Sequence, residues 1–149
     1  MLKLIYSMGD LDVEQLLKLY EEWHLDERGY LDFLRNDFFR QKDAFFAVWA
    51  PHGQYKAALR IEPYRDGLLV AALSTAPNER RKGYGYLLVT EALKYLSTLS
   101  YKVVYSHVDK KNFPSLELHK KCGFQLFSDS AKYIDGTVTQ KSCTMFYYL

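Results

Sequence analysis

The sequence predicts a mixed α/β (α+β) fold in which a sheet is packed by helices. Three observations predict it. The chain has 149 residues, a length that one hydrophobic core can serve, so residues 1–149 are expected to form a single domain. Apolar residues recur at the helical period in some segments and alternate with polar residues in others. The expected order of elements is β, α, α, three strands, α, β, α, β, β, which gives seven strands and four helices.

The first fifty residues predict one strand and two helices. Lys3–Tyr6 alternates apolar and polar residues as a short strand does. Asp10 is a plausible N-cap for a helix that runs to about His24, with Glu14 near its first turn. A second helix is expected at about Tyr30–Arg40, where apolar side chains recur at helical spacing.

The period changes to that of strands after residue 43. Strands are expected over residues 44–50, 54–62 and 68–75. The segments Pro51-His52-Gly53 and Arg65-Asp66-Gly67 resemble hairpin turns, so the three strands should form an antiparallel meander.

The second half of the chain alternates helices and strands. A long helix is expected over residues 83–99, a strand over 102–108, and a helix over about 114–122 that ends at Gly123. The tail predicts two strands, at about 124–133 and 137–148, around an Asp135-Gly136 turn. The last strand is apolar enough to pair with a second copy in a homodimer, or to be covered inside the monomer.

Composition excludes several classes of protein. The chain is 48% hydrophobic and 26% charged, as ordinary globular proteins are. No apolar run approaches the ~18 residues of a membrane span, and no leader-like segment is seen, so we expect a cytoplasmic protein without membrane contact. Cys122 and Cys143 lack the spacing of metal ligands, so no metal is expected.

Charge is divided unevenly along the chain. Residues 1–50 carry six bases against ten acids, whereas residues 51–149 carry fourteen bases against eight acids. A protein that holds a polyanionic cofactor with its second half and a cationic acceptor near its first would show this division, and so would chance surface patterning. A nucleic-acid binder is disfavoured, because Lys and Arg do not alternate with stacking aromatic residues.

The segment from Pro77 to Leu88 carries the clearest chemical signal. It lies where a predicted strand ends and a long helix begins, and it contains Arg80-Arg81-Lys82 followed by Gly83 and Gly85. The first turn of a helix leaves N–H groups without partners, and glycine lets phosphate oxygens approach them. The plainer alternative is a solvated turn before a surface helix.

This arrangement resembles the GNAT superfamily of acetyl-coenzyme A (acetyl-CoA)-dependent N-acetyltransferases. Arg80, Gly83 and Gly85 match its central signature, and Pro77 stands at the usual place upstream. A second stretch is similar to the family's later motif, in which a strand ends in valine, an asparagine follows, and a short helix closes with Gly-Phe; here these are Val108, Asn112, Ser115, Leu118, Lys121, Gly123 and Phe124.

The resemblance implies a fold, a reaction and a set of contacts. The fold would be a twisted, mostly antiparallel sheet of about seven strands with about four helices, whose fourth and fifth strands splay apart. The reaction would move an acetyl group from acetyl-CoA to a primary amine that enters from the other side of the sheet. The implied cofactor-binding residues are Leu73, Ser74, Thr75, Arg80, Arg81, Lys82, Gly83, Tyr84, Gly85, Tyr86, Asn112, Ser115 and His119. For Asn112, a helix cap is an equal alternative, and main-chain N–H groups at Leu73 or Ser74 would hold the oxyanion.

His119 departs from the family pattern. It stands where the family frequently has a tyrosine that protonates the departing sulfur. An imidazole can donate a proton, so His119 is a candidate acid, with a packing or cofactor-contacting role as the alternative. A non-catalytic acyl-CoA-binding module is the competing reading of the whole chain.

Candidates for the base and for the acceptor side remain open. Glu62 and His107 could each act as a water-linked base with Ser74 orienting the water, while the alternatives are an exposed strand residue and a satisfied core histidine. Tyr30, Phe33 and Phe38 either line the acceptor side or belong to the core.

Overall fold

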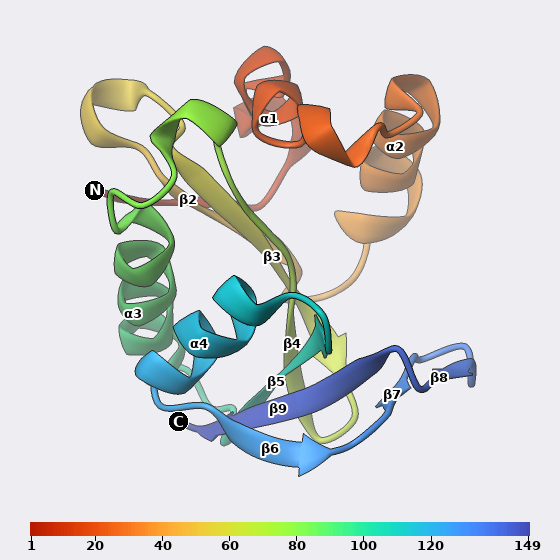
Figure 1. The fold of residues 1–149 in the computed structure, drawn as a ribbon. Coiled ribbons are helices and arrows are strands. Elements are labelled where there is room, and N and C mark those ends of the chain that lie inside the picture. The colour runs from red at the N-terminus through yellow and green to blue at the C-terminus, as the bar shows by residue number, and fades with distance from the viewer.

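A seven-stranded sheet runs through the molecule in the strand order β1-β2-β3-β4-β5-β9-β6 (Figure 1). The computed structural model describes residues 1–149. The seven strands are Leu2–Ile5 (β1), Phe45–Trp49 (β2), Ala57–Tyr64 (β3), Gly67–Thr75 (β4), Val103–Asp109 (β5), Gln125–Ser128 (β6) and Ser142–Tyr148 (β9). All neighbouring pairs are antiparallel except β4 and β5, which are parallel. The predicted mixed, mostly antiparallel fold is confirmed.

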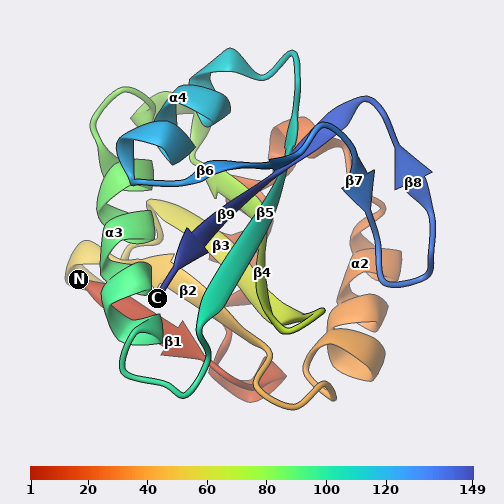
Figure 2. The same cartoon turned by 90° about the horizontal axis from the view of Figure 1, so that it is seen from below.

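Four α-helices cover the two faces of this sheet. They are Val13–Leu19 (α1), Glu27–Phe33 (α2), Tyr84–Leu96 (α3) and Phe113–Lys121 (α4). Figures 1 and 2 show α1 and α2 on one face, and α3 and α4 on the other. None of the helices has both the length and the apolar character that crossing a bilayer requires.

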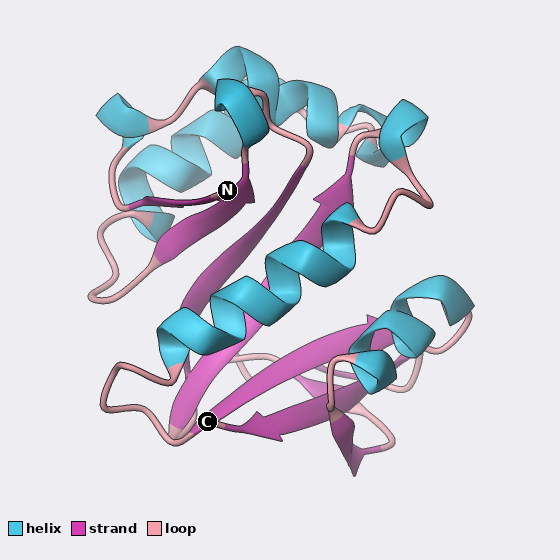
Figure 3. Cartoon of the chain, turned by 90° about the vertical axis from the view of Figure 1, so that its left-hand side faces the viewer, coloured by secondary structure: helices cyan, strands magenta, loops and turns pink.

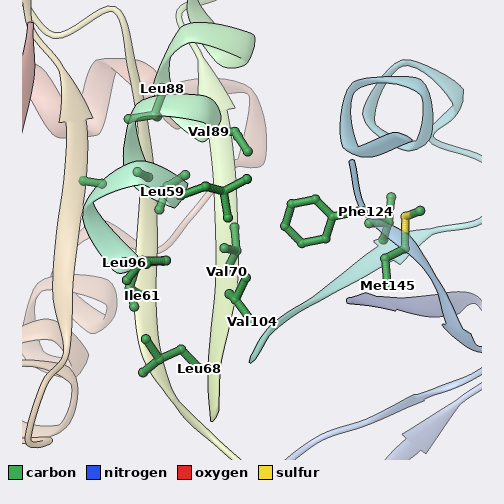
Figure 4. Close-up of a cluster of buried hydrophobic side chains, with 14 of the residues drawn as sticks. Leu59, Ile61, Leu68, Val70, Leu88, Val89, Leu96, Val104, Phe124 and Met145 are labelled. Atoms are coloured by element: carbon green, nitrogen blue, oxygen red, sulfur yellow. The ribbon is translucent and has the colours of Figure 1, made fainter. Parts of the chain in front are cut away.

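Each face has its own hydrophobic cluster. On the α3 face, Leu88 and Leu96 of α3 pack on Leu59, Ile61 and other strand residues (Figure 4). On the opposite face, side chains of α1 and of the segment after α2 pack on β2 and β3; this cluster includes Leu16, Leu19, Leu34, Phe38, Phe46, Val48 and Ala58. The sheet is therefore buried between two layers of helices.

The N-terminal helices differ from the prediction in their bounds. The cap of α1 is Asp12 rather than Asp10, because the Asp12 carboxylate accepts the N–H of Gln15 at 3.1 Å, whereas Asp10 ends a separate helical turn. The predicted helix to His24 is broken after Leu19, and His24 has a left-handed φ of 51°. The second helix starts three residues earlier than predicted, at Glu27, and Leu34–Phe38 continues it as a π-helix.

The strand and tail bounds also shift. β3 covers residues 57–64 instead of 54–62, because Pro51–Gly53 forms a helical turn before it. Each predicted tail strand is divided in two, with a small hairpin of Ala131–Lys132 (β7) and Val138–Thr139 (β8) outside the main sheet. The Asp135-Gly136 turn joins this hairpin, and Gly136 has a φ of +91°.

The last strand lies inside the sheet. β9 pairs with β5 along one edge and with β6 along the other, so β6 is the edge strand. The structure therefore supports coverage of β9 within the monomer rather than its pairing with a second copy. A homodimer through another surface stays a prediction.

The sheet divides between β4 and β5. These strands pair only where Leu68–Val70 of β4 meets Val104–Ser106 of β5. Beyond Val70 the register of β4 with β3 shifts, and Ala72 has a left-handed φ of 55°. Figure 3 shows the two halves of the sheet diverging from this point. One edge of β4 from Ala71 to Thr75 is thereby left without a strand partner.

Candidate active site

Five consecutive main-chain N–H groups, from Lys82 to Tyr86, meet no acceptor within the protein. The first bond of α3 runs from the N–H of Leu87 to the carbonyl of Gly83 at 3.0 Å, and no side chain caps the helix. Gly83 has a φ of +83°, a conformation that glycine adopts without strain. Unpaired amides and the helix dipole together favour a negatively charged group, so this turn fits a diphosphate.

Gly85 brings three elements to the same corner. A methyl group added at Gly85 would lie 3.3 Å from Cδ2 of Leu118 in α4 and 3.6 Å from Oγ1 of Thr75 at the end of β4. The absence of a side chain therefore lets the start of α3 approach both neighbours closely.

The three bases of the turn have different surroundings. Arg80 forms an ion pair with Glu22 at 2.9 Å, and Lys82 pairs with Glu79 at 2.8 Å. Arg81 is exposed and forms no ion pair. An exposed pair contributes only about 0 to 1 kcal/mol, so a phosphate could draw Arg80 or Lys82 away. Lys121, which matched the later motif but was not predicted to bind the cofactor, has its Nζ 4.5 Å from the ring centroid of Tyr86 and adds positive charge to this corner.

Ser74 is held by α1 through its side chain. Its buried hydroxyl donates to the carbonyl of Leu19 at 2.8 Å. The hydroxyl of Tyr20, the residue that follows α1, donates to the carbonyl of Ala72 at 2.5 Å and so holds the irregular part of β4. With its proton already donated, Ser74 offers mainly its main-chain groups to the unpaired edge of β4.

His119 is buried, and both of its ring nitrogens have partners. Its Nδ1 lies 2.7 Å from the carbonyl of Ser115, and its Nε2 lies 2.8 Å from the hydroxyl of Ser106. A carbonyl only accepts, so Nδ1 carries the proton and Ser106 donates to Nε2. Burial lowers the pKa of His119 and favours this neutral form. No N–H is free to protonate a sulfur, so the geometry favours the packing alternative over the acid role.

Asn112 and Ser115 belong to the first turn of α4. The Asn112 side-chain oxygen accepts the N–H of Ser115 at 3.2 Å, which is the geometry of a helix cap. The cap alternative for Asn112 therefore has direct support. A contact of either residue with a cofactor stays a prediction.

His107 has one nitrogen without any partner. Its Nδ1 lies 2.8 Å from Oγ1 of Thr144, and the Thr144 hydroxyl gives its only proton to the carbonyl of Ser130 at 2.9 Å. Which of the two atoms donates in this contact depends on the tautomer of the ring, and Nε2 is buried without a hydrogen bond of good geometry. Burial lowers the pKa of His107, and the nearby carbonyl of Lys132 partly offsets this effect. A role of His107 as a base therefore stays a prediction, beside the alternative of a core histidine.

The face of the sheet under α2 carries two unpaired charges. Arg60 and Glu62 stand two residues apart on β3, both partly buried, and neither forms an ion pair. Arg60 lies close enough to the hydroxyl of Tyr30 to lower its pKa. The Arg60 guanidinium lies over the rings of Phe33, Phe38 and Tyr30 at 5.0, 5.6 and 6.0 Å from their centroids. Phe38 is fully buried and belongs to the core, whereas Tyr30 and Phe33 are partly exposed.

A depression opens beside the β7–β8 hairpin on this side of the sheet. Its volume is about 370 Å³, and it is lined by Tyr64, Arg65, Lys132, Tyr133 and Ile134. The rings of Tyr64 and Tyr133 also flank His107, with centroids 5.2 and 5.1 Å from that of the imidazole. No three His, Cys, Asp or Glu side chains gather closely enough to hold a metal ion.

Comparison with known families agrees with this geometry. The model of the Acetyltransferase (GNAT) family matches residues 10–124, which is most of the chain. The chain belongs to the GNAT family. It is therefore an acyltransferase. No curated protein sequence matches it.

Solved GNAT structures share the whole fold at low sequence identity. The chain matches a ribosomal-protein-alanine N-acetyltransferase from Brucella melitensis with a TM-score of 0.75 and 18% identity, over 100% of this chain and 99% of that one. It matches a PaiA N-acetyltransferase from Thermoplasma acidophilum, solved with coenzyme A, with a TM-score of 0.69 and 12% identity over 100% and 99%. A spermidine N-acetyltransferase chimera of Vibrio cholerae and hSSAT matches with a TM-score of 0.74 and 18% identity over 99% and 95%.

Proposed function

We propose that this chain transfers the acetyl group of acetyl-CoA to a primary amine of a small molecule or a protein. The observation that carries the proposal is the row of five unpaired N–H groups from Lys82 to Tyr86, which lies beside Thr75 at the end of the free edge of β4. A diphosphate bound at this row would leave the pantetheine arm beside the free edge of β4. The thioester would then lie near Ser106, at the point where the strands part.

The reaction is a direct attack of the amine on the thioester. The neutral amine nitrogen bonds to the carbonyl carbon, the carbon–sulfur bond breaks, and the sulfur leaves as a thiolate with the electron pair. The attacking nitrogen loses one proton to a base, and the thiolate takes up one proton. Main-chain N–H groups at Leu73 or Ser74 would stabilise the oxyanion, because β4 offers an unpaired edge there.

His107 is the base that the geometry supports best. Its Nε2 is the ring nitrogen without a hydrogen bond, and burial lowers the pKa of the ring, which favours the neutral form that a base requires. Glu62 stays the second candidate, since its carboxylate is also unpaired. A thiol with a pKa of ~8.5 is a fair leaving group without help, so the mechanism does not need an acid at His119.

A thiol-release assay tests the proposal. Purified protein is mixed with acetyl-CoA and a panel of polyamines, aminoglycosides, amino acids and lysine peptides, and free thiol is measured. We expect amine-dependent release for at least one class. Binding of acetyl-CoA without release for any amine would support a non-catalytic acyl-CoA-binding module instead.

A further inference from the structure

The guanidinium of Arg60 is held in place by aromatic rings and forms no ion pair. Three rings of α2 and the following π-helix lie within 6.0 Å of it. Ring faces stabilise a cation through its flat surface, and each such contact contributes roughly 0.5 to 1 kcal/mol. They do not satisfy the N–H groups, which point outward in the plane of the guanidinium. The rings therefore fix the orientation of Arg60 and leave its donors free.

Two buried polar atoms at this place have no partner. They are Nε of Arg60 and the hydroxyl oxygen of Tyr30. Burial and the charge of Glu62 raise the pKa of Tyr30, whereas the charge of Arg60 and a poorly aligned hydrogen bond from it oppose that rise. Buried polar atoms without partners are rare because each loses its bonds to water without replacement. Both atoms lie too deep for a ligand to reach, so a ligand would meet the terminal N–H groups of the partly exposed Arg60 side chain instead.

The position of Arg60 relates it to the proposed reaction. Arg60 stands opposite Ala71 in the β3–β4 register, and Ala71 is the first β4 residue beyond the pairing with β5. The donors of Arg60 therefore lie on the α2 face, level with the start of the splay. Glu62 lies on the same face, two residues and roughly 7 Å along β3.

We infer that the acceptor is a small amine that also carries a carboxylate, as a free amino acid does, and that Arg60 binds this carboxylate. The inference rests on the proposed acetyl transfer and names its substrate class. A guanidinium presents two parallel N–H groups that match the two oxygens of a carboxylate. The single positive charge beside Glu62 suits a monoanion better than a phosphate dianion, and a polyamine offers Arg60 no acceptor. Arg60 would bind the carboxylate of a zwitterion, and Glu62 would bind its ammonium group.

Matched acceptors test this inference without any variant. Each of the twenty amino acids is compared with its own carboxamide in the thiol-release assay. We expect at least one amino acid to exceed its carboxamide about 100-fold in kcat/KM, on the scale of a lost charge-assisted pair. Polyamines or carboxamides that are acetylated as well as the amino acids would overturn the inference and leave the proposed acetyl transfer standing.

Variants of Arg60 locate the effect. Arg60→Gln should raise KM for the amino acid about 100-fold. Arg60→Lys should raise it less, because lysine keeps the positive charge but lacks the two parallel N–H donors of a guanidinium. Arg35→Gln is the control, since Arg35 is an exposed arginine of the same helical segment that pairs only with Asp32. Acetyl-CoA affinity should match the wild type in all three, whereas Arg60→Gln should also lower the melting temperature because it loses the contacts with three rings.

A binding experiment separates the inference from catalysis. N-acetyl amino acids and their carboxamides are titrated by calorimetry into protein saturated with coenzyme A. We expect heat from an N-acetyl amino acid, loss of that heat in Arg60→Gln, and none from the carboxamide. If no acid gives heat and Arg60→Gln behaves as the wild type, Arg60 does not bind a carboxylate, whatever the acetylation assay shows.

Discussion

Nε2 of His119 lies 2.8 Å from the hydroxyl of Ser106, across the gap between α4 and β5. Ser106 forms the last residue pair that joins β5 to β4, opposite Val70. The histidine therefore anchors α4 at the residue where the sheet divides. Because the carbonyl of Ser115 takes the only N–H of the neutral ring, the bond depends on His119 remaining uncharged.

Exchange of His119 for phenylalanine should cost stability more than turnover. In His119→Phe the hydroxyl of Ser106 is left buried without a partner, which costs about 1 to 3 kcal/mol of unfolding free energy. The double variant Ser106→Ala/His119→Phe should recover part of this loss, since both polar partners are then absent. Denaturant titration measures both. We expect kcat of His119→Phe to fall less than about tenfold, whereas a larger fall with a lost limb of the pH profile would restore the acid role.

Gly83 should matter for cofactor binding beyond its effect on the backbone. Gly83→Ala places a side chain at a φ of +83°, which costs roughly 1 to 2 kcal/mol of stability. Gly136→Ala is the matched control, because Gly136 has a φ of +91° and, like Gly83, nothing within 4 Å of the added methyl group. Both variants should lose similar melting temperature, and only Gly83→Ala should raise the Kd for acetyl-CoA, by about tenfold. Equal affinities in the two variants would remove Gly83 from the cofactor site.

His107 should govern the acid limb of the pH profile. Burial holds the pKa of His107 below its ordinary value of about 6.5, so the free base persists as pH falls below neutrality. We expect kcat/KM of the wild type to fall only below about pH 6.5, and His107→Gln to lose that limb together with roughly 100-fold or more of its plateau rate. His52→Asn, at an exposed turn, is the control. A wild-type limb that persists in His107→Gln would transfer the role to another group such as Glu62.

The same pKa shift affects stability in a defined direction. A folded-state pKa below the unfolded value means that the unfolded chain binds more protons, so stability falls as pH drops below about 6.5. His107 and His119 should both contribute to this loss, and His119→Phe should make the dependence on pH shallower. Unfolding free energies at pH 7.5 and pH 5.5 measure it.

Local patterns made much of the fold predictable. The glycine turn before α3 and the Gly123 that ends α4 depend on residues close in sequence, so their chemistry was visible in one short string. The bounds of α1 were less predictable, because Asp10 and Asp12 are both suitable N-caps. The start at Asp12 goes with the burial of Leu16 and Leu19 against the sheet.

The working details of the site depend on pairs that are distant in sequence. The guanidinium of Arg60 packs on the ring of Phe33, and His119 and His107 form hydrogen bonds with Ser106 and Thr144. The spacing of residues along the chain does not predict these contacts, since each depends on how a helix or strand packs on the sheet. For this reason the sequence identified His107 and His119 as candidates but could not predict the hydrogen-bond partners of their ring nitrogens.

Calorimetry with two thioesters tests the central claim, that unpaired amides from Lys82 to Tyr86 bind the diphosphate of acetyl-CoA. Acetyl-CoA and acetyl-pantetheine carry the same reactive group, but only the first has the diphosphate. We predict that acetyl-CoA binds at least about 100-fold more tightly, on the scale of several charge-assisted hydrogen bonds. Equal affinities for the two thioesters, or no heat with any coenzyme A ester, would contradict the account.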